Sequence, residues 1–374
     1  MTAEPSLHLF FPENDIALAR NVDSYTAPPA AVRLRRAGEA LPLWYGEAGD
    51  RFVATGINAA WLDGIKGRFG MDIDVFDYRP EAYRAAPWGW SRASRTVFRR
   101  LGFDGSRLPG DGVLDRLREL SHRRTAAEVA RRLREATGIG EAAVEIREAY
   151  ELGAFLARVP QAIVKQPWSS SGRGMIAVSR DNFESQRQAV AGMIRRQGSV
   201  MAERHYDKAL DFAMLFRMSG GRCESAGLSV FETAGLGVYT GNILAPEDEL
   251  RAIVCGKTGE AAFDAVAGTL PRVLEDVIGA DYEGPLGVDM MVTGDGALVP
   301  VVEINLRMTM GHLCARFYER YAHRGARGRF MVTNERCEDR ADVRGGRMRG
   351  GSLNLTPAGG DFNFVVRLSA LCAD

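Results

Sequence analysis

Two short stretches of the chain carry residue types that suit nucleotide chemistry. Lys165 ends the apolar run 162–164 and precedes a loop rich in serine and glycine, 168–174. The backbone N–H groups of such a loop can approach phosphates closely, because glycine has no side chain and adopts unusual φ/ψ angles. Far downstream, Glu303 and Asn305 are two residues apart in a predicted strand, hence on one face, and their oxygens suit Mg²⁺. Together these stretches predict a site for ATP and a divalent cation.

The sequence lacks the motifs of the two commonest ATP-binding classes. The pattern G-x-x-x-x-G-K-[ST] is absent, which excludes a P-loop NTPase. The protein-kinase combination of a Gly-rich loop, a later lysine, H-R-D and D-F-G is absent as well.

The arrangement resembles the ATP-grasp superfamily. In that family a lysine ends a strand before a Ser/Gly loop, a hinge with a glutamate follows, and an aspartate and a Glu-x-Asn strand complete the metal site. The same parts occur here in the same order over roughly residues 120–320: Lys165 with the loop 169–174, Glu203, Asp289, and Glu303 with Asn305. The resemblance implies an α/β (α+β) fold, with an N-terminal Rossmann-like pre-grasp domain and two α+β grasp subdomains that hold ATP between them. The opening of the chain resembles a little-characterised bacterial branch of the family.

The Ser/Gly loop is expected to act as a lid over the β- and γ-phosphates. A hairpin turn is the alternative, although three serines and two glycines exceed what a turn requires. Lys165 would add a point charge at the phosphates, and Arg173 a charge for the γ-phosphate or for a phosphorylated intermediate. The other expected phosphate-binding residues are Ser169, Ser170, Ser171, Gly172 and Gly174.

A second basic residue commonly contacts the α-phosphate in this family. Arg123 or Arg124, in the Arg-rich predicted helix 114–134, is the candidate for that role, and an arginine would then replace the usual lysine. The alternative is that these arginines form only a solvated helix face.

The adenine site is expected where the strand 200–203 enters the hinge. By the resemblance, the backbone of Met201, Ala202 and Glu203 would bond the adenine edge. The carboxylate of Glu203, or of Asp211, would accept from the N6 amine or the ribose hydroxyls. An ordinary strand-end glutamate is the alternative reading of Glu203.

The metal site sets a geometric condition. Asp289 and Glu303 lie on two arms of a hairpin that turns near 294–296, and they share a face only if the loop is odd-numbered or a bulge intervenes. We expect a three-residue loop, and we expect Asp289, Glu303 and Asn305 to hold one or two Mg²⁺, for which Mn²⁺ could substitute. The resemblance implies that Arg307 neutralises the phosphate of an acyl-phosphate intermediate.

Composition excludes some partners. The 374 residues contain 48 Lys+Arg and 48 Asp+Glu, so no global positive field favours nucleic acid or anionic membranes. No apolar run approaches the roughly 18 residues that span a bilayer. Five scattered cysteines without C-x-x-C spacing fit a reducing compartment, and the N-terminus has no signal-peptide pattern, so a cytoplasmic protein is expected.

The predicted organisation has four parts. They are a pre-grasp domain at 1–120, a first grasp subdomain at 121–205, a second at 206–325, and an Arg/Gly-rich loop with a final strand at 326–374. In the first part, strands are predicted at 7–11, 41–45 and 72–77, and a helix is predicted at 142–156 in the second. The turn 12–15 follows the first strand, where it either caps a helix or contacts substrate.

The resemblance implies an ATP-dependent carboxylate–amine ligase that forms an acyl phosphate, releases ADP and forms a C–N bond. Its substrates would be a small-molecule carboxylate and an amine, and a homodimer is possible. A small-molecule kinase of the same fold and a nucleotide-binding module without turnover remain alternatives. The sequence does not identify the two substrates.

Overall fold

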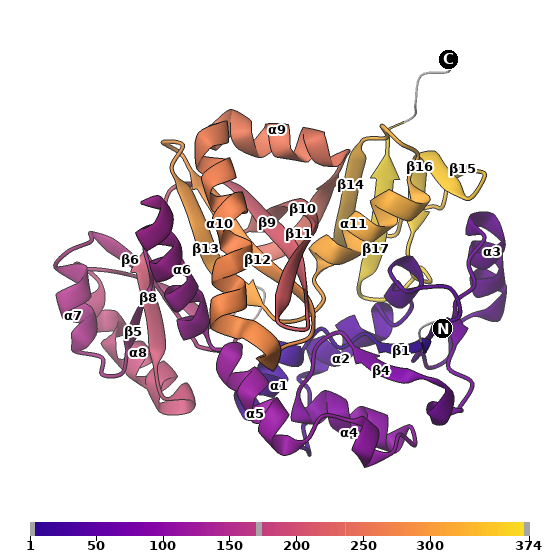
Figure 1. Ribbon diagram of the computed structural model, residues 1–374, viewed down its shortest axis with the longest axis horizontal. Helices are drawn as coiled ribbons and strands as arrows, with labels where there is room; N and C mark the ends of the chain where they lie inside the picture. Colours follow the sequence, from indigo (N-terminus) through magenta and orange to yellow (C-terminus); the bar gives the residue numbers. More distant parts are fainter. Residues whose placement is uncertain (1–3, 170–173, 236, 370–374) are drawn as a thin grey trace.

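The computed structural model describes residues 4–169, 174–235 and 237–369, which form three β-sheets with helices around them (Figure 1). The first sheet is parallel throughout, in the order β3-β2-β1-β4, as the sequence predicts. Its strands are β1 (Ser6–Leu9), β2 (Arg51–Phe52), β3 (Asp74–Val75) and β4 (Arg84–Pro87). The helices between them are α1 (Asn14–Arg20), α2 (Pro29–Ala37) and α3 (Ala59–Phe69).

The strand predicted at 41–45 is wrong. This segment is a buried 3₁₀ helix, Leu41–Trp44. Pro42 has no N–H to give to a strand ladder, and the Trp44 indole Nε1 donates to the Leu355 carbonyl at 2.7 Å instead. The strand predicted at 72–77 shortens to the two residues of β3.

Three helices lead from the first sheet to the second. They are α4 (Arg92–Arg100), α5 (Asp111–Leu120) and α6 (Arg123–Thr137). Helix α6 is amphipathic, and its apolar side packs on α10 and β13, which places its N-terminus beside the strand that carries Glu303.

The second sheet is antiparallel, in the order β5-β8-β6-β7. It contains β5 (Val144–Ile146), β6 (Gln161–Lys165), β7 (Met175–Ser179) and β8 (Val200–Arg204), with α7 (Glu151–Leu156) and α8 (Phe183–Gln197). The helix predicted at 142–156 is therefore only half right. Its first half is β5, whose β-branched residues pair with β8.

The third sheet has nine strands in the order β13-β12-β9-β10-β11-β14-β17-β16-β15. Their bounds are β9 (Lys208–Ser219), β10 (Arg222–Ala234), β11 (Val238–Leu244), β12 (Gly284–Thr293), β13 (Leu298–Asn305), β14 (Gly328–Thr333), β15 (Asp342–Arg344), β16 (Arg347–Asn354) and β17 (Asn363–Leu368). Its helices are α9 (Glu247–Thr258), α10 (Glu260–Ile278) and α11 (Met310–Tyr321). The segment expected as an Arg/Gly-rich loop thus contains β14, β15 and β16, because Phe330 and Met348 point inward and are 1% and 0% exposed.

The first sheet and the C-terminal strands share one hydrophobic core. Phe10, next to β1, contacts Phe364 of β17 edge-on, and Trp44 packs on Phe317 of α11. This shared core holds the N-terminal layer against the end of the nine-stranded sheet. Within the described residues, no helix is both long and apolar enough to cross a membrane.

Candidate active site

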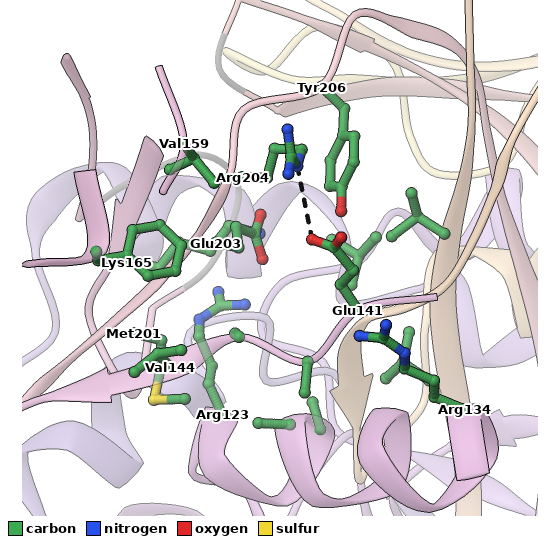
Figure 2. Close-up of a pocket in the computed structure, with 18 of the residues that line it drawn as sticks. Arg123, Arg134, Glu141, Val144, Val159, Lys165, Met201, Glu203, Arg204 and Tyr206 are labelled. Carbon is green, nitrogen blue, oxygen red and sulfur yellow. Dashed lines mark ion pairs between the residues drawn. The ribbon is translucent and has the colours of Figure 1, made fainter. Parts of the chain in front are cut away.

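A cavity of about 350 Å³ opens between the second sheet, helix α6 and strand β13 (Figure 2). Its charged walls carry Lys165 of β6, Glu203 of β8 and Arg123 of α6. Its apolar walls include Met201 and the β13 valines, Val299, Val301 and Val302. The cavity therefore combines an apolar part suited to a flat ring with a charged part suited to phosphates.

Lys165 is held in the cavity by the second sheet. It lies opposite Met201 in the β6–β8 register, is 6% exposed, and forms an ion pair with the Glu203 carboxylate. A buried ammonium is tolerated because this partner offsets part of its desolvation cost.

Arg123 connects the start of the Ser/Gly loop to strand β13. Its Nε donates to the Gln166 carbonyl at 3.0 Å and its Nη2 to Ser169 Oγ at 3.2 Å, while Nη2 lies 2.8 Å from Glu303 Oε1. The guanidinium is buried, yet among the described residues its Nη1 has no hydrogen-bond partner. A buried donor without a partner is costly and fits an anion that the cavity would receive.

Hydrogen bonds hold both backbone groups of Trp168, where the Ser/Gly loop starts. The Gln197 side chain accepts from the Trp168 N–H at 3.0 Å and donates to the Trp168 carbonyl at 3.1 Å. Ser169 is buried beside Arg123. At the far end, Gly174 has φ +65°, a left-handed backbone conformation that favours glycine. Ser170, Ser171, Gly172 and Arg173 lie outside the described residues.

The hairpin β12–β13 places the two predicted acidic ligands side by side. Asp289 pairs with Glu303, whereas Met291 pairs with Val299, so a bulge adds two residues to β13 between these positions. Pro300 lies in the bulge, where a missing N–H costs no ladder bond. The hairpin turns through the three-residue loop expected, 294–296: the Thr293 N–H donates to the Ala297 carbonyl at 2.9 Å, and Gly296 has φ +86°. This odd-numbered loop lets the two acids share a face, and the two-residue bulge places Asp289 directly opposite Glu303.

Asn305 completes this group. Its Nδ2 donates to Asp289 Oδ2 at 3.1 Å. Burial, and then the neighbouring Glu303 carboxylate, raise the pKa of Asp289 to about 7. Among the described residues no three His, Cys, Asp or Glu side chains converge on one point, so the donors here are two carboxylates and an amide. This set fits Mg²⁺, which keeps several waters and takes one or two protein carboxylates, and a cation would offset the repulsion that raises this pKa.

Arg307 lies just beyond β13, but its partner was not predicted. Its Nε and Nη2 donate to the two carboxylate oxygens of Asp15 at 3.1 and 2.8 Å, and Nη2 also donates to Asn305 Oδ1 at 2.7 Å. Asp15 belongs to α1, at the carboxyl end of the parallel sheet. The turn residues at 12–15 indicated that this edge of the sheet could face a ligand. They could not indicate the contact between Asp15 and Arg307, because these residues are 292 positions apart in the sequence.

Four of the predicted nucleotide-binding residues that the structure describes lie outside the cavity lining: Ser169, Gly174, Ala202 and Asp211. Asp211 on β9 accepts from Thr233 Oγ1 at 2.6 Å and is paired with Lys208. Ala202 is fully buried in the sheet.

Five polar residues that line the cavity were not predicted for it: Arg134, Glu141, Arg158, Arg204 and Tyr206. Arg204 Nε lies 3.5 Å from Glu141 Oε2 (Figure 2), and burial raises the pKa of the Tyr206 hydroxyl to about 12. Tyr206 comes shortly after the strand 200–203 that was expected to enter the hinge, and this position is the one sequence feature that could have indicated its place in the cavity. Arg134, Glu141 and Arg204 are brought together by β5, which pairs with β8 and packs against α6.

Comparison with known proteins identifies the fold. No protein-family model and no curated protein sequence matches the chain significantly. Among solved structures, the ADP complex of N5-carboxyaminoimidazole ribonucleotide synthetase is similar, with a TM-score of 0.50 and 10% identity over 99% of this chain and 93% of that chain. A biotin carboxylase complex from Campylobacter jejuni has a TM-score of 0.49 and 12% identity, over 97% of this chain and 87% of that chain. Both structures are ATP-grasp enzymes. The first, with a TM-score of 0.50 at 10% identity, shows the fold alone. The chain has the ATP-grasp fold.

Proposed function

We propose that the protein is a MgATP-dependent ligase that activates a small-molecule carboxylate as an acyl phosphate and transfers the acyl group to an amine. The observation that carries this proposal is the convergence of Lys165, Arg123 and Arg307 with the Asp289–Glu303–Asn305 group, from strands and helices far apart in the sequence. The similar solved structures include complexes with ADP and with an ATP analogue, which supports a nucleotide in this fold.

The second sheet suggests where the adenine would bind. Met201 and Ala202 are paired with β5 on one side and β6 on the other, so their backbone groups are already used. Glu203 and Arg204 extend past the end of β5 and have a free edge toward the cavity. We therefore assign the adenine edge to Glu203 and Arg204, with Met201 and Tyr206 as apolar walls.

In this proposal the phosphates lie between Lys165 and Arg123, under the loop that starts at Ser169. Asp289, Glu303 and Asn305 would hold Mg²⁺, which when bound neutralises phosphate charge. The substrate carboxylate oxygen attacks the γ-phosphorus. The new O–P bond replaces the bridge to the β-phosphate, and ADP leaves. Arg307 lies beside the acyl phosphate so formed and balances its charge. An amine then displaces phosphate from the acyl carbon. Catalysis of this kind depends on positioning and electrostatics rather than on a protein nucleophile.

The proposal is tested by incubating the protein with MgATP, pooled small carboxylates and pooled amines while separating ADP from AMP. ADP formation that requires both a carboxylate and an amine, and that is lost in Glu303→Ala, is the expected result. AMP formation would contradict an acyl phosphate. A stable phosphorylated product with no amine consumed would identify a kinase instead.

A further inference from the structure

The turn between β1 and α1 contains buried polar atoms that the protein leaves unpaired. Glu13 and Asn14 are 2% and 1% exposed, and among the described residues Glu13 Oε2, Asn14 Oδ1 and the nearby Tyr25 hydroxyl have no hydrogen-bond partner. The Glu13 carboxylate is paired with Arg35 through Oε1, and the Tyr25 hydroxyl can donate as well as accept. Asn14 Oδ1 is therefore the buried acceptor that lacks a donor among the described residues, and it indicates a donor that a ligand would supply.

One of these residues faces the active site. Asn14 and Asp15 line a narrow cleft together with Ser169, Glu303 and Arg307, on the side of β13 that faces the first sheet. The cleft holds only about 10 Å³, room for roughly one water molecule, because the Asp15–Arg307 ion pair spans it. A substrate that reaches the metal group from this side must separate that pair.

The surrounding chain keeps these groups in close contact. The Met308 N–H donates to the Trp88 carbonyl at 2.8 Å, which joins the end of β13 to the end of β4. A Cβ on Gly89 would lie 2.6 Å from Asn14 Nδ2 and 3.0 Å from Arg307 Cβ. Only glycine therefore allows Asn14 and Arg307 to approach each other this closely.

We propose that the carboxylate activated at this site belongs to an amino acid, which binds as a zwitterion in the cleft. Its carboxylate replaces Asp15 on the Nε/Nη2 edge of Arg307, and its ammonium takes the place of Arg307 as the partner of Asp15, with Asn14 Oδ1 accepting a further hydrogen bond. This inference rests on the proposed ligase function, because Arg307 would then remain beside the carboxylate while it is phosphorylated.

Charge balance favours this ligand over simpler ones. A carboxylic acid without an amino group would pair with Arg307 but leave the Asp15 carboxylate, whose side chain is 15% exposed, without its cation. A simple amine would leave Arg307 unpaired in the same way. Separating a largely buried ion pair is strongly unfavourable unless both charges find new partners. A zwitterion supplies both partners and also the donor that Asn14 lacks.

The test avoids the need to know the amine substrate. Hydroxylamine converts an acyl phosphate to a hydroxamate, so protein, MgATP and hydroxylamine are incubated with the twenty common amino acids or with the matching acids that lack the α-amino group. We expect hydroxamate and ADP from at least one amino acid, and a KM at least tenfold higher for its deamino counterpart.

Variants then assign the effect to the cleft. Asp15→Asn and the near-isosteric Asn14→Leu should each raise the KM for the amino acid at least tenfold while the KM for ATP stays within twofold, which also shows that the variant is folded. The exposed Asp63→Asn is the matched control and should change neither constant.

Each of four outcomes would overturn the inference. Equal use of the deamino acid by the wild-type protein, or an unchanged KM for the amino acid in both cleft variants, would show that the ammonium is not recognised here. Hydroxamate from deamino acids alone would show that the substrate is not an amino acid, while the proposed ligase function would still hold. Hydroxamate from neither set would overturn the amino-acid substrate, and if the pooled carboxylates and amines also gave no ADP, the ligase function itself would be overturned.

Discussion

At the residue scale, Arg123 shows why an arginine rather than a lysine occupies this position. Its planar guanidinium donates to the Gln166 carbonyl and to Ser169 and pairs with Glu303. Among the described residues Nη1 has no partner, so it can still donate to a ligand. A lysine offers one ammonium and cannot reach these groups together. The guanidinium thereby sets the spacing between the phosphate loop and the metal strand.

We predict that Arg123→Lys raises the KM for ATP about tenfold or more, a loss of about 1.4 kcal/mol, with a smaller effect on melting temperature than Arg123→Ala. The neighbouring Arg124→Lys is the control, because Arg124 is about half exposed and pairs with Glu145 outside the cavity. Steady-state ADP formation measures both. Equal effects of the two substitutions would contradict a phosphate-binding role for Arg123.

Asp289 gives the site a pH dependence. Its pKa is raised from its ordinary value of 3.8 to about 7, so between these values the folded protein keeps a proton that the unfolded chain has lost. The free energy of unfolding therefore falls as the pH rises through this range, by at most about 4 kcal/mol and by less to the extent that water reaches the carboxyl.

Asp289→Asn should accordingly stabilise the protein at pH 8 more than at pH 5 when no divalent cation is present. In the wild type, Mg²⁺ with an ATP analogue should stabilise more at pH 8 than at pH 5, because the ligand is the ionised carboxylate. Thermal melts at both pH values, with and without Mg²⁺, measure this. A stabilisation by Asp289→Asn that is the same at both pH values would refute the raised pKa.

At the element scale, helix α8 fixes the start of the phosphate loop through its last residue. Gln197 bonds both backbone groups of Trp168, and the Trp168 indole Nε1 donates to the Arg118 carbonyl at 2.9 Å. We predict that Gln197→Ala raises the KM for ATP severalfold and costs about 1 kcal/mol of stability for the lost hydrogen bonds.

The control for this prediction is Gln188→Ala on the exposed side of α8, which should leave both quantities unchanged. Kinetics at varied ATP concentration and urea unfolding measure the two effects. A loss of stability with no change in the KM for ATP would show that the Gln197–Trp168 hydrogen bonds stabilise the fold but do not position the loop for ATP.

Elements with a strong local pattern could be predicted from the sequence. The strand predicted at 200–203 is found as β8, and the hairpin predicted around 294–296 is found as β12 and β13. The order Lys165, Glu203, Asp289, Glu303 indicated the superfamily fold. The three-residue loop that gives Asp289 and Glu303 a common face could be predicted, but their direct pairing could not, since it depends on a bulge in β13 that has no local signal.

Elements whose state depends on tertiary contacts could not be predicted. The segment 41–45 has the composition of a strand but is a 3₁₀ helix, because Pro42 and the Trp44–Leu355 hydrogen bond decide its conformation. The strands β14 to β16 carry many arginines and glycines, and their apolar residues become recognisable only once β17 lies beside them. The Asp15–Arg307 pair belongs to the same class, since it joins two sheets.

At the scale of the whole molecule, the site is assembled from all three sheets. Asp15 comes from the end of the first, Lys165 and Glu203 from the second, and Glu303 and Arg307 from the edge of the third. A ligand that contacts every part should therefore stabilise the folded state as a unit rather than one sheet.

We predict that MgAMP-PNP at one hundred times its dissociation constant stabilises the protein by about 2.7 kcal/mol, which corresponds to about 3 °C in melting temperature for a chain of this length unfolding in one step. Glu303→Gln should lose the part of this shift that depends on Mg²⁺, while the nucleotide alone still binds through Lys165 and Arg123. The control is Glu319→Gln on α11, an exposed carboxylate paired with Arg316. A calorimetric trace in which MgAMP-PNP moves one transition and leaves another in place would show that the sheets unfold separately, and that the nucleotide contacts fewer of them than the geometry of the site requires.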